Sequence, residues 1–522
     1  MDEFISTVEN QVIGLHPLDT QAAFLNIPYH FFFSNSDSAA DFMPNDAIRL
    51  SFYRALKQFP ILAGYLRPEG TGQTSVVIDK NDLNMPEYIE STSDTHFDTL
   101  RENHFHHSAW PKGLTRAGAI TMAAPGPAGR IRLANVHVVR LKDNSGVIIF
   151  INIPHYVVDG TGFFSFVELW GKHCLAERSG DRQLALQASQ LEYCFDRDII
   201  SRHLPVERKP LGIETIQTYT GFSPIADWLA WLSPNTRGRV LNKAKFSSGV
   251  VSHTFRVSRQ ALDSLRKEVG EFMADSSDDN LTDRYLLAAV LSKLIARAHL
   301  HRKQQEKANV SVAGCLLGAA RSVLGAVAGL VGYGVRLLCC SSSCSSSAKR
   351  DPSKYQSLNL LDDVRHGLGI VDKQYMGNGL LPHNAQCPLD VLETPITPKS
   401  LAQAVDLVRP IYENADAALV ASFVDLLTSN PKSFTRPMIY MAKTPELLVI
   451  TCEMEFKLYA SDFGNGPPEW VCTIPSFVAN FIGLLPSPPP STDVIANIIL
   501  KALVMKQVLK DEFWRELTQI IY

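Results

Sequence analysis

The feature that most constrains the fold is an apolar run in the first third of the chain. Residues 147–153 read Val-Ile-Ile-Phe-Ile-Asn-Ile, with one polar residue among them. A run of this kind has no solvent-facing side, so it predicts a strand that is buried on both faces of a sheet. The β-branched stretch 131–141 and the polar turn 142–146 come before it, and together these segments predict a hairpin.

A titratable side chain stands where this strand ends. His155 follows Pro154, and Asp159 and Gly160 come shortly after it. Neutral imidazole, with a reference pKa of about 6.5, can accept a proton at cellular pH, and a rigid strand end can aim it at a substrate. Gly160 permits a turn that a residue with a Cβ would resist. His155 is therefore a candidate general base, although a histidine at a strand end is more often a structural residue.

The chain is long enough for several domains, with 522 residues of which 45% are apolar. Prolines punctuate a stretch of weak periodicity that begins after residue 202. We therefore expect an N-terminal domain at 1–202, a crossover linker at 203–245 and a C-terminal domain at 246–522.

Local patterns predict several elements within these domains. Apolar spacing, capping residues and β-branched runs are the signals. They predict helices capped by Asn45 and Thr282, strands at 447–452 and 494–500, and one closing helix at 501–518.

One segment does not fit a globular pattern. Residues 303–355 hold an Ala/Gly/Val/Leu-rich stretch followed by a run of serines and cysteines. The uncharged run between Arg321 and Arg336 is shorter than the ~20 residues that cross a bilayer. We interpret the segment as an insertion that is partly disordered at its Ser/Cys end. A membrane-surface helix within residues 309–347, acylated at a cysteine, and an error in the gene model are the alternatives.

Charge and cysteine usage narrow the class of protein. The formal net charge of −3 and the lack of a basic patch give no reason to expect a nucleic-acid partner. The nine cysteines have no metal-ligand spacing, and their odd number favours a reducing compartment. Residues 1–4 do not resemble a secretory signal, so we expect a cytoplasmic protein. The cluster His104–His107 has no cysteine or acidic residue at ligand spacing, so we expect no metal site.

Two short patterns lie far apart in the chain. The first is His155-x-x-x-Asp159-Gly160, and the second, residues 462–466, reads Asp-Phe-Gly-Asn-Gly. Weaker patterns occur in a fixed order around and between them, at residues 16–19, 59–66, 363–365 and 375–378. In this order the patterns resemble those of the BAHD acyltransferases, particularly the fungal members, whose signatures are His-x-x-x-Asp-Gly and Asp-Phe-Gly-Trp-Gly.

The resemblance implies an α/β fold of two similar chloramphenicol acetyltransferase-like domains. Each would hold a mixed sheet with flanking helices, and the active-site channel would lie at their interface. The resemblance also implies acyl-CoA as co-substrate, no permanently bound cofactor, and a small-molecule acceptor such as a secondary-metabolite alcohol or amine. Transfer would be direct, in a ternary complex, with His155 as the general base. We expect a monomer.

The same resemblance suggests roles for further residues. Asp159 would point away from the substrate and pair with a buried arginine, for which Arg365 is the match. Gly160 would support the site structurally, and so would the second signature through Asp462, Phe463, Gly464 and Gly466. Thr451 is the candidate donor to an oxyanion by its position. Glu453 and Asn378 are candidates for the acceptor pocket.

The chain departs from the family pattern at two positions besides the insertion. Asn465 replaces the signature tryptophan, and Glu453 replaces the tryptophan of an upstream Thr-Ser-Trp segment, which suggests a changed acceptor pocket. Two other functions stay open. A peptide-synthetase condensation domain shares the fold and the first motif, but Pro154 occupies the place of its additional histidine. A degenerate acyltransferase that only binds a ligand is the non-enzymatic alternative.

Overall fold

The fold is described from a computed structural model. The structure describes residues 1–21, 25–69, 73–114, 129–221, 223–233, 236, 240, 249–273, 281–324, 354–431, 447–473 and 479–522, and within 306–324 it describes only the helical backbone.

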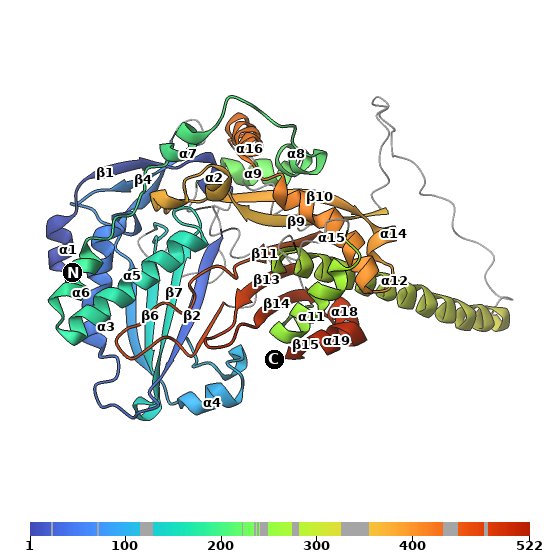
Figure 1. Ribbon diagram of the computed structural model, residues 1–522, viewed down its shortest axis with the longest axis horizontal. Coiled ribbons are helices and arrows are strands. Elements are labelled where there is room, and N and C mark those ends of the chain that lie inside the picture. The colour runs from blue at the N-terminus through green and yellow to red at the C-terminus, as the bar shows by residue number, and fades with distance from the viewer. Residues whose placement is uncertain are drawn as a thin grey trace.

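The apolar run forms the central strand of a five-stranded sheet in the N-terminal half. This strand, β7 (Gly146–Pro154), is buried along its whole length. It pairs antiparallel with β6 (Asn135–Arg140), so the predicted hairpin is confirmed. The helices α3 (Asn45–Gln58) and α5 (Gly160–Ser179) lie along this sheet (Figure 1). The predicted Asn45 cap is one residue late, because Pro44 holds the cap position and Asn45 is the first helical residue.

The other strands of this sheet come from three regions of the chain. The strand order is β12-β2-β7-β6-β5, and β5 runs parallel to β6 while the other pairs are antiparallel. The remaining strands are β2 (Asn26–Ser34), β5 (Glu87–Thr92) and β12 (Trp470–Thr473). A separate three-stranded sheet is formed by β1 (Gln11–Gly14), β3 (Tyr65–Pro68) and β4 (Thr74–Ile78).

The C-terminal half is built around a seven-stranded sheet. Its order is β10-β9-β11-β13-β14-β8-β15, with β9, β11 and β13 parallel and the remaining pairs antiparallel. Its strands are β8 (Val250–Val257), β9 (Tyr355–Asp363), β10 (Leu380–Pro388), β11 (Leu448–Cys452), β13 (Phe481–Pro486), β14 (Val494–Lys501) and β15 (Thr518–Ile520). Helices α11 (Arg259–Gly270), α12 (Asp283–Leu324) and α15 (Pro398–Glu413) lie against it (Figure 1). The expected α/β class, with a mixed sheet in each half, is confirmed.

Strand β12 connects the two halves, because it belongs to the sheet of one half and to the chain segment of the other. Strand β12 belongs by sequence to the C-terminal half, yet it pairs antiparallel with β2 and completes the N-terminal sheet. The chain leaves the seven-stranded sheet after β11 and returns to it at β13, which pairs with β11. The two sheets are therefore tied together by a segment that passes from one to the other and back.

The stretch expected to be a linker contains helices. Residues 203–245 hold α8 (Ile213–Thr220) and α9 (Pro224–Trp231). Helix α8 lies beside α16 (Ala417–Ser429), and the Tyr219 and Phe423 rings contact each other with centroids 5.1 Å apart (Figure 1). The predicted single closing helix is wrong, because the chain forms two short helices and a strand there. These are α18 (Ala502–Val508), α19 (Glu512–Leu517) and β15. Asp511 separates the helices, and its carboxylate accepts the Trp514 backbone N–H to cap the second one.

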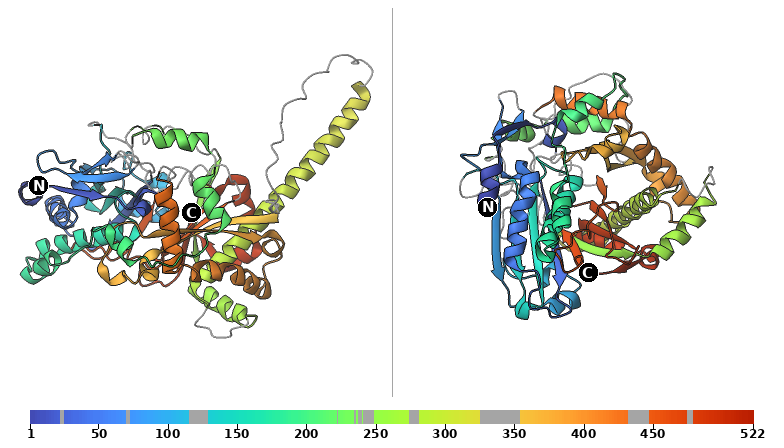
Figure 2. Two further views of the ribbon diagram at one scale, coloured as in Figure 1. Left: turned by 90° about the horizontal axis from the view of Figure 1, so that it is seen from above. Right: turned by 60° about the vertical axis from the view of Figure 1, so that its left-hand side comes forward.

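Helix α12 enters the segment that was interpreted as an insertion. It continues to Leu324, and its C-terminal part extends away from the rest of the protein (Figure 2). The Ser/Cys-rich part of the insertion lies outside the described residues. None of the described helices carries an apolar stretch of bilayer-spanning length.

A buried histidine predicts that stability depends on pH. His30 on β2 is fully buried, with its ring 4.7 Å from Phe150 and 4.2 Å from Trp110 between ring centroids. Burial lowers its pKa from 6.5 to about 3. Below about pH 6.5 the unfolded chain therefore binds a proton at His30 that the folded protein does not bind, so the free energy of unfolding decreases as the pH is lowered. The contribution of His30 alone should lower the free energy of unfolding by about 1.4 kcal/mol when the pH is lowered from about 8 to about 5.5.

Urea unfolding of wild type and His30→Phe at these two pH values tests this expectation. The variant should show a pH-dependent loss of unfolding free energy that is smaller by about 1.4 kcal/mol. The control is His104→Asn, which replaces an exposed histidine. An equal pH dependence in wild type and His30→Phe would contradict the assignment.

Candidate active site

His155 lies at the end of β7, where the N-terminal sheet meets the C-terminal half. Its backbone N–H donates to the Leu25 carbonyl at 2.8 Å, which fixes the chain immediately after the strand. The residue is half-buried. Its Nδ1 is 2.7 Å from Oδ1 of Asn378, which comes from the loop before β10 in the C-terminal half. The histidine of the first signature therefore sits at the junction of the two halves.

The environment of His155 favours the neutral ring. Burial lowers the pKa of His155 below its usual 6.5, although the Asp159 carboxylate and the hydrogen bond to Asn378 oppose this effect. At neutral pH the imidazole is therefore mostly unprotonated, which is the state a general base requires.

Asp159 faces away from His155 and into a buried ion pair. Its Oδ2 accepts from Arg365 Nη1 and from the Gly379 backbone N–H, both at 2.8 Å, and its Oδ1 accepts from the Gly162 N–H at 3.2 Å. Burial alone would raise the pKa of Asp159, but the Arg365 guanidinium holds it below its usual range. The structure thus brings together the aspartate and the arginine that the family resemblance pairs. Removing one partner of such a pair typically costs about 3–5 kcal/mol.

A second buried ion pair lies on the other side of Asn378. The Asp19 carboxylate is fully buried, and its Oδ2 is 3.0 Å from Arg197 Nε, whose side chain is also buried. Oδ1 of Asp19 accepts from the backbone N–H of Asn378 at 3.0 Å and from its Nδ2 at 3.2 Å. The sequence patterns predict no role for either residue. Asp19 was visible only as part of the weak pattern at 16–19, and Arg197 carries no sequence signal.

Two glycines make room for the two arginines. An added Cβ at Gly377 would overlap Tyr375 Oη and Arg197 Nη1, and one at Gly379 would overlap Arg365 Nη1. The Tyr375 ring lies between the guanidiniums, with its centroid 5.6 Å from Cζ of Arg197 and 5.3 Å from Cζ of Arg365. This packing explains why the loop carries Tyr375 together with glycines at 377 and 379.

The placement of Asn378 differs from the sequence-based expectation. Asn378 was expected in the acceptor pocket, but it is fully buried and its amide contacts His155 and Asp19. It is a neighbour of the candidate base. The loop position could not be read from the sequence, because it depends on contacts with segments more than 200 residues away.

Thr451 and Glu453 lie together at the end of β11. The Thr451 hydroxyl is 3.4 Å from Oε1 of Glu453, and both residues are half-buried. The Tyr29 hydroxyl from β2 also donates to the Glu453 carboxylate. Burial raises the pKa of Glu453. Residues of both halves thus meet here, as they do at His155.

Residues 462–466 form a tight turn that packs on the N-terminal half. Oδ1 of Asp462 accepts the backbone N–H groups of Gly464, Asn465 and Gly466 at 2.7, 3.1 and 2.9 Å. Both glycines have positive φ, and Phe463 is fully buried. The Asn465 side chain accepts from the Met43 backbone N–H at 3.1 Å. The turn is held from within by one carboxylate, and Asn465 fastens it to the N-terminal half without a tryptophan.

Gly160 is required by a contact between the halves. An added Cβ at Gly160 would overlap the Phe456 ring, which comes from the segment after β11. Phe456 is hydrogen-bonded through its backbone N–H to the Glu453 carbonyl at 3.1 Å. Gly160 therefore allows the segment that carries Glu453 to approach the start of α5.

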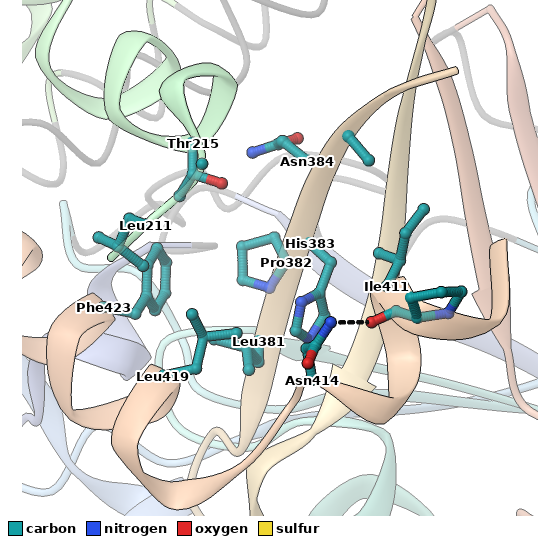
Figure 3. Close-up of a pocket in the computed structure, with 13 residues that line it drawn as sticks. Leu211, Thr215, Leu381, Pro382, His383, Asn384, Ile411, Asn414, Leu419 and Phe423 are labelled. Carbon is teal, nitrogen blue, oxygen red and sulfur yellow. Dashed lines mark hydrogen bonds between the residues drawn. The ribbon is translucent and has the colours of Figure 1, made fainter. Parts of the chain in front are cut away.

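Two cavities of the described structure are lined by residues other than His155. One, of about 260 Å³, lies between α8, β10 and α16, and its lining includes Thr215, His383 and Phe423 (Figure 3). The other, of about 620 Å³, lies at the ends of β9, β11 and β13 and is lined by Asp363 and Cys452, among others. The second reaches residues adjacent to Arg365 and Thr451 in sequence.

The histidine cluster at 104–107 shows no metal-binding geometry. The rings of His106 and His107 contact each other with centroids 4.0 Å apart, and His106 Nδ1 is 2.7 Å from the Ser108 hydroxyl. In the part of the chain that the structure describes, no group of three or more His, Cys, Asp or Glu side chains is arranged to hold a metal ion.

Comparisons with known proteins agree with this architecture. Residues 6–193 match the Transferase family. TRI101 of F. sporotrichioides, solved with coenzyme A and T-2, is 16% identical, with a TM-score of 0.66 over 98% of this chain and 100% of that one. The resemblance to the BAHD acyltransferases is confirmed.

Two further structures share this BAHD-type fold. TRI101 of F. graminearum, solved with coenzyme A and deoxynivalenol, is 15% identical, with a TM-score of 0.64 over 98% of this chain and 100% of that one. Vinorine synthase is 15% identical, with a TM-score of 0.55 over 98% of both chains. No curated protein matches the sequence significantly. At these identities the likeness establishes the BAHD-type fold alone.

The glycine packing around Asn378 gives a stability test. Gly377→Ala should destabilise the protein by about 1–3 kcal/mol, because the new methyl group overlaps the Tyr375 and Arg197 side chains. Gly14→Ala is the matched control, since no atom lies within 4 Å of its added Cβ. The measurement is the urea midpoint of each variant. Equal midpoints for the two variants would contradict the described packing around Asn378.

Proposed function

We propose that this protein transfers an acyl group from acyl-CoA to a hydroxyl, or an amine, of a small-molecule acceptor. The observation that carries the proposal is the position of His155, a half-buried imidazole at the junction of the two halves whose Nδ1 is 2.7 Å from Oδ1 of Asn378. Burial lowers the pKa of this ring, which favours its neutral form. TRI101 structures of the same fold contain coenzyme A together with a toxin, T-2 or deoxynivalenol, which supports an acyl-CoA co-substrate and a small-molecule acceptor.

The reaction requires one side chain that acts first as a general base and then, once protonated, as a general acid. Nε2 of His155 takes the proton of the acceptor hydroxyl as its oxygen attacks the thioester carbonyl. The tetrahedral intermediate collapses, the C–S bond breaks, and the ester forms. The imidazolium then gives the same proton to the departing CoA thiolate, so CoA leaves as the thiol. No covalent acyl-enzyme is needed, because both substrates would meet at one histidine and proximity supplies much of the rate.

Thr451 is the candidate donor to the oxyanion of this intermediate. A hydroxyl donor can stabilise the developing charge if it is placed in advance. The Thr451 hydroxyl has one proton to donate, and in this structure it faces the Glu453 carboxylate. The hydroxyl must therefore rotate away from Glu453 before it can donate to an oxyanion. The half-buried Glu453 carboxyl is the natural partner for a donor group on the acceptor.

A condensation-type reaction is the second candidate. The first condensation domain of the calcium-dependent antibiotic synthetase has a TM-score of 0.51 and 11% identity, over 97% of this chain and 95% of that one. Pro154 precedes His155 here, where a condensation domain carries another histidine. We therefore favour free acyl-CoA as donor over a carrier-bound acyl group.

Thiol release from acyl-CoA is the direct test. Wild type should release CoA from one of acetyl-, malonyl- or aromatic acyl-CoA in the presence of a panel of alcohols and amines. His155→Ala should lower kcat by about 10²- to 10⁴-fold, because the proton of the acceptor loses its base. Equal thiol release from the two proteins would overturn the mechanism.

The pH dependence should follow the His155 ring. Because burial places its pKa below 6.5, the acid limb of kcat/KM should lie below pH 6.5, where the ring becomes protonated and can no longer accept a proton. The measurement is kcat/KM for the best acyl-CoA and acceptor across about pH 5 to pH 8. An acid limb centred above pH 7 would contradict the assignment of this group.

Glu453 should affect the acceptor more than acyl-CoA. Glu453→Gln removes the charge and keeps the shape, so KM for the acceptor should change by about fivefold or more while KM for acyl-CoA stays within about twofold. A fivefold change corresponds to about 1 kcal/mol, the net contribution of one typical hydrogen bond. The control is Glu455→Gln, two residues away, where the side chain is 75% exposed. An unchanged acceptor KM would remove Glu453 from the acceptor pocket.

A further inference from the structure

The Asn378 amide can face His155 in only one orientation. Nδ2 of Asn378 lies 2.6 Å from the His155 carbonyl and 3.2 Å from Oδ1 of Asp19. Both of these oxygens can only accept hydrogen bonds, so the group between them must be the NH₂ of the amide. A flipped amide would set its oxygen against a carbonyl and a carboxylate. The Asn378 oxygen therefore points at the imidazole.

This orientation determines which ring nitrogen of His155 carries the proton. Oδ1 of Asn378 is an acceptor 2.7 Å from Nδ1, so Nδ1 must donate. A neutral imidazole has one such proton, and Nε2 is left with its lone pair. Nε2 makes no hydrogen bond within the described part of the chain, so it can meet an acceptor group.

Asp19 is held rigidly enough to impose this arrangement. It lies on the short helix α2 (Pro17–Thr20), and its Oδ2 accepts the His16 backbone N–H at 2.8 Å in a capping box. Arg197 neutralises its charge in the buried ion pair, and Nη2 of Arg197 donates to the Val157 carbonyl at 2.6 Å. The carboxylate is thus anchored to the segment immediately after His155 as well as to Asn378.

We propose that Asp19 is a positioning residue of the reaction, which through Asn378 holds His155 in the tautomer with its proton on Nδ1 and its lone pair on Nε2. This inference rests on the proposed function. In many hydrolases a carboxylate touches the histidine directly and fixes its tautomer. Here the carboxylate acts one residue further away, and a neutral amide touches the ring.

Asp159 provides a matched comparison within the same site. It is also a buried aspartate paired with an arginine, and its charge opposes the effect of burial, which lowers the pKa of His155. Its described hydrogen bonds, however, go to Arg365, Gly379 and Gly162 and not to the Asn378 amide that touches the ring. Asp19→Asn and Asp159→Asn remove the same charge from similar surroundings. Loss of stability is common to both variants, and a change of the His155 tautomer is expected for Asp19→Asn alone.

The test combines ¹⁵N NMR of histidine-labelled protein with steady-state kinetics. Wild-type His155 should show a pyrrole-like Nδ1 and a pyridine-like Nε2. In Asp19→Asn these signals should move toward the opposite tautomer. The kcat should fall by about 10- to 100-fold at an acyl-CoA KM within about twofold of wild type, because the base is in the wrong form. Asp159→Asn should keep the wild-type signals while its urea midpoint falls.

Four results would overturn the proposal or the function on which it rests. Wild-type His155 with its proton on Nε2 overturns it, and so does Asp19→Asn with wild-type signals and kcat. Should Asp19→Asn not fold, Asn378→Ala removes the same link while both members of the Asp19–Arg197 ion pair stay in place, and an unchanged tautomer there overturns the proposal. The NMR signals need no substrate. A shifted tautomer in a protein whose wild type transfers no acyl group would therefore overturn the proposed function, and with it the catalytic meaning of Asp19.

Discussion

Two buried carboxylate–guanidinium pairs clamp the loop of residues 375–379, and the candidate site depends on this clamp. Asp159 and Arg365 lie on one side of Asn378, and Asp19 and Arg197 on the other. Charges taken out of water are costly unless each is paired and its remaining hydrogen-bonding groups are satisfied. Backbone groups of the loop supply part of that satisfaction, since the Gly377 carbonyl accepts from Arg365 at 2.6 Å and the Asn378 N–H donates to Asp19. The loop and the pairs therefore stabilise one another.

The clamp links the chemistry to the assembly of the whole chain. His155 is delivered by the N-terminal sheet and Asn378 by the C-terminal half, while Asp19 and Arg197 come from α2 and from the start of α7 (Asp198–His203). None of these segments orients the imidazole alone. The exchange of β12 into the N-terminal sheet holds the halves together at a distance from the histidine. A base whose orientation depends on both halves is fully formed only in the folded protein.

The two family signatures have different physical meanings in this protein. The first contains the candidate base, but its aspartate and glycine serve packing, through Arg365 and Phe456. The second forms a self-capped turn against α5 and β2, where the Phe463 ring contacts Trp170 and Phe33 with centroids 5.1 and 5.4 Å apart. Asn465 can stand in for a tryptophan there because the turn is held by Asp462, and the replacement keeps a contact to Met43. The change at Asn465 is therefore compatible with an intact site.

The sequence by itself determined the elements that rest on local physics. The apolar run that became β7, the hairpin before it, and the position of His155 at the strand end all follow from side-chain periodicity and turn residues. The resemblance to the BAHD acyltransferases, carried by the two signatures and the weak patterns, further implied the pairing of Asp159 with Arg365. Local reasoning failed for the closing segment, where the strand β15 forms only because β8 offers an edge to pair with.

Only the tertiary structure decided how the site is organised. The contact of Asn378 with His155 joins residues 223 positions apart, and the Asp19–Arg197 pair forms around it. The pairing of β12 with the N-terminal sheet likewise has no signal in the sequence. Hydrogen bonds and buried ion pairs between distant segments have no period and no fixed spacing. Their partners are selected by the packing of the whole chain, because only that packing excludes water from the charges and makes each missing partner costly.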